Sequence, residues 1–238
     1  MAPYPTSLFM TVDFTQLLVG LLLLWFPRQW MRLGISVGTR RRRTGGKADQ
    51  IQPWERREPG DPRISFRLEF GKVRNYVDLL RAAAGGLAIV GGFGIPASLA
   101  SGGEGQALPA WQVFALQAAI LGLGALTQIL RYERRHVSLY PPIFYLSGLS
   151  LGLCSAWPAL FAFVLIWGLN PMLGGPQWFL SVYALVILVF GFLFRTHGLT
   201  LPMVASGLFL LPVLLSLLAR RPLVNLTRKP APPAGASG

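Results

Sequence analysis

Long apolar runs separated by short polar segments dominate the chain. A helix needs roughly 20 apolar residues to cross the hydrocarbon core of a bilayer. Backbone polar groups in lipid must find partners within their own segment, so we expect each long run to be a helix. The pattern predicts an all-α, polytopic integral membrane helix bundle with about six transmembrane helices, at Leu8–Phe26, Ala82–Ala100, Trp111–Leu130, Ile143–Leu169, Trp178–Phe194 and Leu199–Leu218.

The composition favours the same class. Hydrophobic residues make up 53% of the 238 residues and charged residues only 13%, whereas soluble domains carry about 25% charged residues. The mean hydropathy of +0.49 is also that of a chain surrounded by lipid. A single cysteine, Cys154, excludes an intrachain disulfide.

The runs divide the chain into four parts. We expect residues 1–26 to form an N-terminal anchor helix and residues 27–81 a basic cytoplasmic segment. Residues 82–219 then form a five-helix membrane bundle, and residues 220–238 a disordered tail that ends in Pro, Ala and Gly. A secretory signal has basic residues before its apolar region, and the first run has none. The first run is therefore predicted to remain part of the protein as an anchor.

The end of the basic segment contains an amphipathic stretch. Ile64, Phe66, Leu68 and Phe70 alternate with polar residues, which is the spacing of a short strand. Apolar residues then recur at helical spacing as far as Leu80. The whole stretch from Arg63 to Arg81 is predicted to lie flat on the membrane surface, with its apolar face down, and to lead into the second span.

The basic residues predict the orientation of the chain. Fourteen of the 22 Lys and Arg residues lie between Pro27 and Arg81, including the run Arg40, Arg41, Arg42 and Arg43. Because basic loops remain on the cytoplasmic side, this segment should be cytoplasmic and the N-terminus outside. Nineteen of the 22 basic residues are Arg, a bias typical of GC-rich bacterial genomes, so the bacterial inner membrane is the expected location.

One charge cluster conflicts with six crossings. Six spans leave Arg220, Arg221, Arg228 and Lys229 outside, with 18 basic residues inside and four outside. If 143–169 instead entered the membrane and returned, 21 would lie inside and one outside. Because a re-entrant segment needs shielding by protein and 27 residues fit one tilted span, the single span is the preferred interpretation, and the broken helix remains its alternative.

Polar side chains within the spans are the candidates for chemistry. Asp13 is the one carboxylate inside a predicted span, and such a residue is a hypothesis for proton or cation binding. It lies near the outer end, where water has access, so a structural role is favoured. Gln117 and Gln128 share one face of the third span. Hydrogen bonds between helices are the commoner use of such residues, and a polar path is the alternative.

The remaining candidates lack partners for catalysis. His136 and His197 are both predicted at the cytoplasmic boundary, without a second metal ligand at a recognised spacing. The fourth span contains the possible nucleophiles Ser147, Ser150, Cys154 and Ser155, with no acid or His in a nearby helix to act as a base. The sequence therefore predicts no catalytic residue, no metal site and no cofactor, and it leaves the roles of Asp13, His136 and His197 open.

The partner predictions rest on two features. The arginines from Arg40 to Arg43 should attract anionic lipid headgroups rather than nucleic acid, because they lie beside a membrane span. The small residues Gly148, Gly152 and Ala156, at spacing four, should allow close helix packing, within the bundle or with a protein partner. A non-enzymatic accessory or scaffold subunit of a membrane complex is the leading hypothesis. A small transporter or channel component is the alternative, and an intramembrane enzyme acting on lipid comes third.

Overall fold

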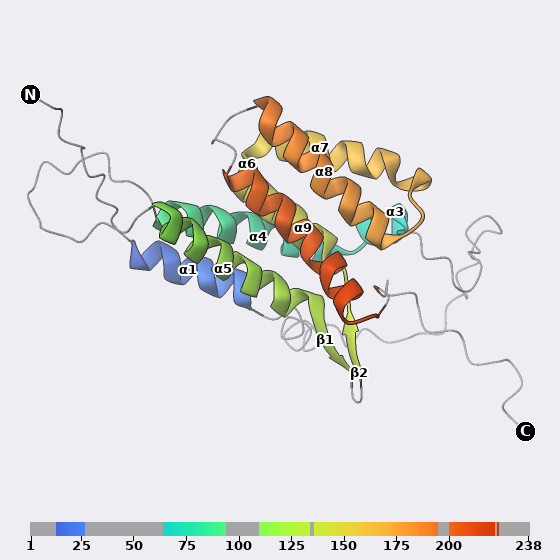
Figure 1. Ribbon diagram of the computed structural model, residues 1–238, viewed down its shortest axis with the longest axis horizontal. Coiled ribbons are helices and arrows are strands. Elements are labelled where there is room, and N and C mark those ends of the chain that lie inside the picture. Colours follow the sequence, from blue (N-terminus) through green and yellow to red (C-terminus); the bar gives the residue numbers. More distant parts are fainter. Residues whose placement is uncertain are drawn as a thin grey trace, which may run out of the picture.

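The computed structural model describes residues 13–26, 64–93, 110–133, 136–194, 200–221 and 223, without the side chains of residues 68, 110 and 131–138. The described chain is helical apart from one β-hairpin (Figure 1). Its elements are α1 (Phe14–Trp25), α3 (Phe66–Phe70), α4 (Val73–Gly92), α5 (Ala110–Ile129), β1 (Leu130–Glu133), β2 (His136–Leu139), α6 (Ile143–Cys154), α7 (Ala156–Leu169), the 3₁₀ turn η2 (Asn170–Met172), α8 (Pro176–Phe194) and α9 (Thr200–Leu218).

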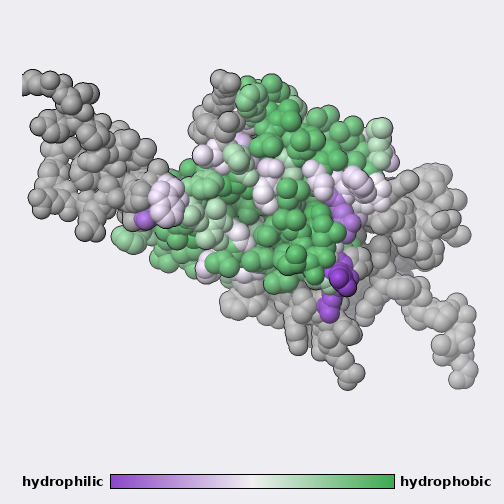
Figure 2. All heavy atoms as spheres, viewed as in Figure 1, coloured by the Kyte–Doolittle hydropathy of each residue, from purple (hydrophilic) through white to green (hydrophobic). Residues whose placement is uncertain are grey.

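Three helices are long and apolar enough to cross a membrane. They are Trp111–Ile129, Pro176–Phe194 and Thr200–Leu218, and they match three of the spans predicted from sequence. Large apolar side chains stand exposed on their outer faces, among them Trp111, Leu185 and Leu214. Figure 2 shows an apolar surface over most of the visible helices, with hydrophilic atoms near the end of α9. The prediction of a helical membrane protein is confirmed at this level.

The fourth predicted span is two helices rather than one. The chain breaks at Ser155, whose φ of 64° lies in the left-handed region that few side chains tolerate. Phe144 near the start of α6 lies against Trp167 near the end of α7, with ring centroids 5.9 Å apart. In one straight helix, these residues would be separated by roughly 34 Å. The prediction of a single span over 143–169 is therefore wrong, because the chain reverses at Ser155.

Helix α6 lies at the centre of the bundle, in contact with α4, α7, α8 and α9. Nearly all of its side chains are buried. Figure 1 shows α1, α4 and α5 on one side of α6 and α9, and α7 and α8 on the other. The core is a continuous cluster of apolar side chains that includes Leu149, Tyr183 and Phe209. This arrangement shields both arms of the α6–α7 hairpin along part of their length.

Two further predictions about residues 64–92 need correction. The alternation from Ile64 to Phe70 does not form a strand, since residues 66–70 are the short helix α3. Phe70 points into an aromatic cluster instead, with its ring centroid 5.2 Å from that of Phe144 and 4.9 Å from that of Trp167. Helix α4 begins at Val73, so the boundary predicted after Arg81 falls inside a continuous helix.

The β-hairpin was not predicted. Strands β1 and β2 pair antiparallel, with Leu130 opposite Leu139 and Glu133 opposite His136. The hairpin follows α5 directly, and the Tyr140 N–H donates to the Ile129 carbonyl 3.0 Å away, which brings the chain back to begin α6. Alternation over four residues is too short a pattern to identify a strand from sequence.

Candidate functional site

The most concentrated polar group in the described residues surrounds the C-terminal end of α1. Asp78 and Arg81 are both buried on α4, although each carries a charge in an otherwise apolar bundle. Arg81 Nε donates to Asp78 Oδ1 at 3.0 Å, and the two side chains are only 8% and 3% exposed. A buried ion pair of this kind is maintained only where further hydrogen bonds satisfy the rest of both groups.

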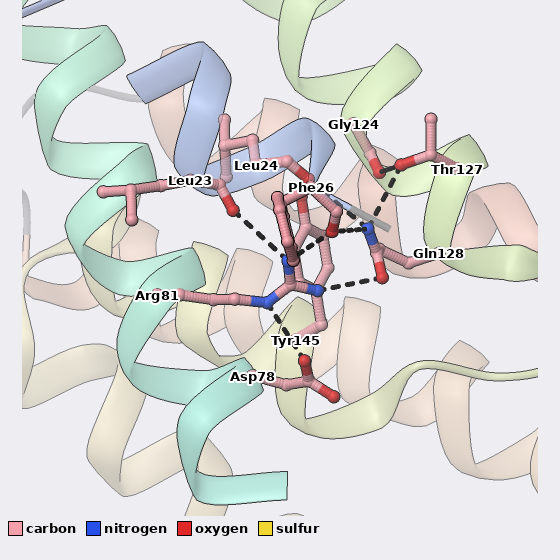
Figure 3. A network of polar contacts seen from close by, with 9 residues as sticks. All are labelled: Leu23, Leu24, Phe26, Asp78, Arg81, Gly124, Thr127, Gln128 and Tyr145. Carbon is pink, nitrogen blue, oxygen red and sulfur yellow. Dashed lines mark hydrogen bonds and ion pairs between the residues drawn. The ribbon is translucent and has the colours of Figure 1, made fainter. Parts of the chain in front are cut away.

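Those further bonds come from three other helices. The Arg81 guanidinium donates to the Phe26 carbonyl at 2.6 Å and to the Leu23 carbonyl at 3.4 Å, both at the end of α1. It also donates to Gln128 Oε1 on α5 at 2.9 Å. The ring of Tyr145 on α6 lies 5.3 Å from the guanidinium carbon, within the range of a cation–π contact. Figure 3 shows how these side chains converge from α4, α5 and α6.

The same α1 end receives two more donors. Gln128 Nε2 lies 3.2 Å from the Phe26 carbonyl and 3.4 Å from the Leu24 carbonyl. The Tyr145 hydroxyl donates to the Leu24 carbonyl at 3.1 Å. The last carbonyls of a helix have no partner within it and carry the negative end of its dipole. Arg81, Gln128 and Tyr145 together form the C-terminal cap of α1, and we call these residues with Asp78 the capping network.

The first half of α4 buries polar side chains and exposes apolar ones, which is the reverse of a surface helix in a soluble protein. Between Val73 and Arg81 it buries Asn75, Asp78 and Arg81. On its other side it exposes Val73, Tyr76, Val77 and Leu80. Polar groups inside and apolar groups outside are the arrangement expected of a helix that faces lipid. The capping network therefore belongs to a part of α4 that the sequence had assigned to the membrane surface.

A second polar contact joins α6 to α8. The Tyr183 hydroxyl donates to Ser147 Oγ at 3.1 Å, and the Ser147 hydroxyl donates to the Ile143 carbonyl at 2.8 Å. The Ser150 hydroxyl donates to the Ser147 carbonyl at 2.8 Å. These serines thus bind a phenol and their own helix backbone. Neither His nor a carboxylate takes part in these described contacts.

The structure gives the predicted candidates different places. Asp13 is exposed and caps the N-terminus of α1, accepting from the backbone N–H groups of Thr15 and Gln16 at 2.9 and 3.2 Å. It is therefore the N-cap of the described helix α1. Gln128 forms the hydrogen bonds between helices that were favoured for it, whereas Gln117 is buried without contributing to the capping network. Cys154 is buried at the end of α6.

The histidines add no metal site to the described part of the chain. His136 begins β2, but its side chain lies outside the described residues, as does the whole of His197. The described residues contain no group of three His, Cys, Asp or Glu side chains that would hold a metal ion. The arginines from Arg40 to Arg43 also lie outside the described residues.

The glycines of α6 contact the same chain. A Cβ on Gly148 would collide with the Leu79 carbonyl of α4, and one on Gly152 would lie 2.7 Å from the Ala83 carbonyl. The two helices therefore approach closely through these glycines, which was one of the two uses predicted for them. A protein partner would have to displace α4 to reach them. Ala156 belongs to α7, beyond the break, so the three small residues do not share a helix.

Asp78, Arg81 and Tyr145 were not predicted as a group from the sequence. Asp78 and Arg81, three residues apart on α4, are the one available signal, since this spacing places them on one helix face. Comparison with known proteins adds no assignment: no family model, no curated protein and no solved structure matches the chain.

Proposed function

We propose that this protein is a non-enzymatic accessory or scaffold subunit of a membrane complex. The observation that supports it most is the use made of the capping network. Its donors, from Arg81, Gln128 and Tyr145, are directed at the carbonyl end of α1 or at one another. Side chains used in this way position helices, and substrates would have to compete with those bonds.

The proposed location is a bacterial inner membrane, with the N-terminus outside and residues 27–81 cytoplasmic. The charges of 27–81 support this orientation. Arg40 to Arg43 then lie where anionic headgroups of the inner leaflet can attract them, each contributing about 1 kcal/mol near the surface. The proposal includes several crossings, of which α5, α8 and α9 have the required length and apolar content.

A small transporter component is the second candidate. The break at Ser155 supports it, since interrupted helices in the membrane often border the binding sites of transporters. In the described residues, however, Ser147 and Ser150 of α6 and Tyr183 of α8 bind one another or the α6 backbone. The accessory role is therefore the stronger proposal.

Purification of the full chain separates the two candidates. The tagged protein, expressed at its native level and extracted in a mild detergent, should carry at least one stoichiometric protein partner that mass spectrometry identifies. Crosslinking in intact cells before extraction provides the control for partners that detergent removes. A chain that stays alone in both experiments, and that carries solute into proteoliposomes, would contradict the accessory role and support transport.

A further inference from the structure

The direction of each helix follows from its contacts. Gly20 of α1 lies against Ile89 of α4, and Gly85 of α4 lies against Leu24 of α1, so these helices are antiparallel. Gly148 contacts Leu79, and the later Gly152 contacts the later Ala83, so α4 and α6 run in the same direction. Both therefore start at the end of the bundle where α1 finishes.

The second half of the chain continues this alternation. Helix α7 returns along α6, as the contact between Phe144 and Trp167 requires. Gln177 near the start of α8 donates to Ser216 near the end of α9 at 2.9 Å. Asn170, just after α7, donates to the carbonyl of Ile64, just before α3, at 2.8 Å. The ends of α7 and α9 and the start of α8 therefore lie at the same end of the bundle as α3.

The two arms of the hairpin are also shorter than the helices that are long enough to cross a membrane. Helix α6 has 12 residues and α7 has 14, which at 1.5 Å per residue gives lengths of about 18 and 21 Å. Helices α8 and α9, with 19 residues each, are about 28 Å long. The two arms are thus roughly 7 to 10 Å shorter than α8 and α9.

Charge separates the two ends of the bundle. Among described residues, the exposed cations Arg67, Arg220 and Arg221 lie at the α3 end, the first before α4 and the other two after α9. Lys72, at the start of α4, is half-buried there and pairs with Glu69 at 2.6 Å, so this end carries one described carboxylate outside the bundle core as well. At the opposite end, the charged side chain within the described ranges is Asp13. Strongly exposed apolar residues adjoin these cations, with Leu218 87% and Val73 77% exposed. A change from lipid-facing apolar residues to exposed cations is typical of the headgroup level.

We propose that the α6–α7 hairpin enters and leaves the membrane on the side of the basic segment 27–81, so that the end of α9 joins that side. Arg67, Lys72, Arg220 and Arg221 then form one cationic rim that binds anionic phospholipid headgroups of that leaflet. The basic residues divide accordingly, with 21 on the side of the rim and Arg195 alone on the other. This resolves the charge conflict that six crossings leave at the C-terminus.

Cysteine labelling tests the path of the chain. In a full-length Cys154→Ala background, single cysteines replace Gly103, Met172, Thr200 or Ala219, of which the last three are exposed in the structure. An impermeant maleimide added to intact cells should label positions 103 and 200 together. Positions 172 and 219 should react only after permeabilisation.

Six crossings predict the opposite grouping, with positions 103, 172 and 219 together and position 200 on the other side. That result would overturn the hairpin. If 172 and 219 are labelled together from outside while 103 and 200 are not, the hairpin holds and the proposed overall orientation is wrong. The accessory role is tested separately by its protein partners.

Lipid addition tests the rim. The purified full chain in neutral detergent should gain thermal stability with dioleoylphosphatidylglycerol but not with dioleoylphosphatidylcholine. The Arg220→Gln, Arg221→Gln variant should lose roughly 2–4 °C of that gain per arginine, and the matched Lys pair should restore it. An equal gain with phosphatidylcholine or with inorganic phosphate, or an unchanged gain in the Gln pair, would show that the rim does not bind anionic headgroups.

Discussion

At the scale of single residues, the free-energy cost of burying the Arg81 charge explains why hydrogen-bond acceptors surround its guanidinium. Its guanidinium has a carboxylate, two helix-end carbonyls and an amide oxygen as acceptors. Removal of one partner from a buried ion pair leaves the other uncompensated, which costs about 3–5 kcal/mol. In this bundle, the loss of Arg81 would also remove two bonds that cap α1.

Arg81→Gln should therefore lower the thermal unfolding temperature of the detergent-purified protein strongly. The matched control is Arg74→Gln, two helical turns earlier on α4 and outside the capping network. It should change the unfolding temperature little. The double variant Asp78→Asn, Arg81→Gln should recover part of the loss, because no buried charge remains unpaired. Equal unfolding temperatures for the Arg81 and Arg74 variants would show that the capping network contributes no stability.

At the scale of helices, the distance between α4 and α6 depends on glycine. Close backbone approach replaces the hydrophobic effect as the source of association in lipid, because lipid tails are as apolar as the side chains. The missing Cβ atoms of Gly148 and Gly152 permit that approach. Elsewhere the structure leaves room for a side chain, since a Cβ on Gly207 of α9 would meet nothing within 4 Å.

Gly148→Ala should separate α4 from α6 and reduce the yield of folded protein, whereas Gly207→Ala should be neutral or slightly stabilising, since Ala favours a helix by about 1 kcal/mol over Gly. Size-exclusion profiles in detergent and thermal unfolding measure both effects. If the two variants behave alike, the interface between α4 and α6 tolerates a methyl group and the close approach is not needed for folding.

At the scale of the whole molecule, the basic segment and the bundle meet at α3. Ile64 is buried and Phe70 packs on the aromatic side chains of α6 and α7. Apolar residues of the stretch that was predicted to bind lipid thus pack in part against α6 and α7 of the same chain. The arginines before it remain the part of the segment proposed to act on headgroups.

A peptide of residues 28–63 should therefore bind vesicles that contain anionic lipid through charge alone. Binding should weaken as salt rises, because the Debye length falls from about 10 Å at 0.1 M to about 3 Å at 1 M. Replacing Arg40 to Arg43 with glutamine should remove most of it, as vesicle co-sedimentation would measure. Similar binding to neutral vesicles would contradict an electrostatic role for these arginines.

Sequence alone determined the class of the protein and the helices α5, α8 and α9. Lipid requires long apolar segments with internally satisfied backbones, and this requirement is visible in composition and run length. The bounds of these three helices accordingly agree with the predicted spans to within about two residues, as expected for helix ends. The small residues of α6 likewise indicated close packing, although they did not indicate the helix packed against them.

Tertiary structure decided the reversal at Ser155, the docking of α3 and the burial of Asp78 with Arg81. No local sequence pattern predicts any of these three features. An apolar run of 27 residues fits one tilted helix, which sequence alone therefore favoured over two shorter ones. The reversal needs shielding by protein, and α4, α8 and α9 supply it only in the folded bundle. A charged pair in a helix is likewise expected at the surface from sequence alone. Here three other helices supply the hydrogen-bond and cation–π partners that allow its burial.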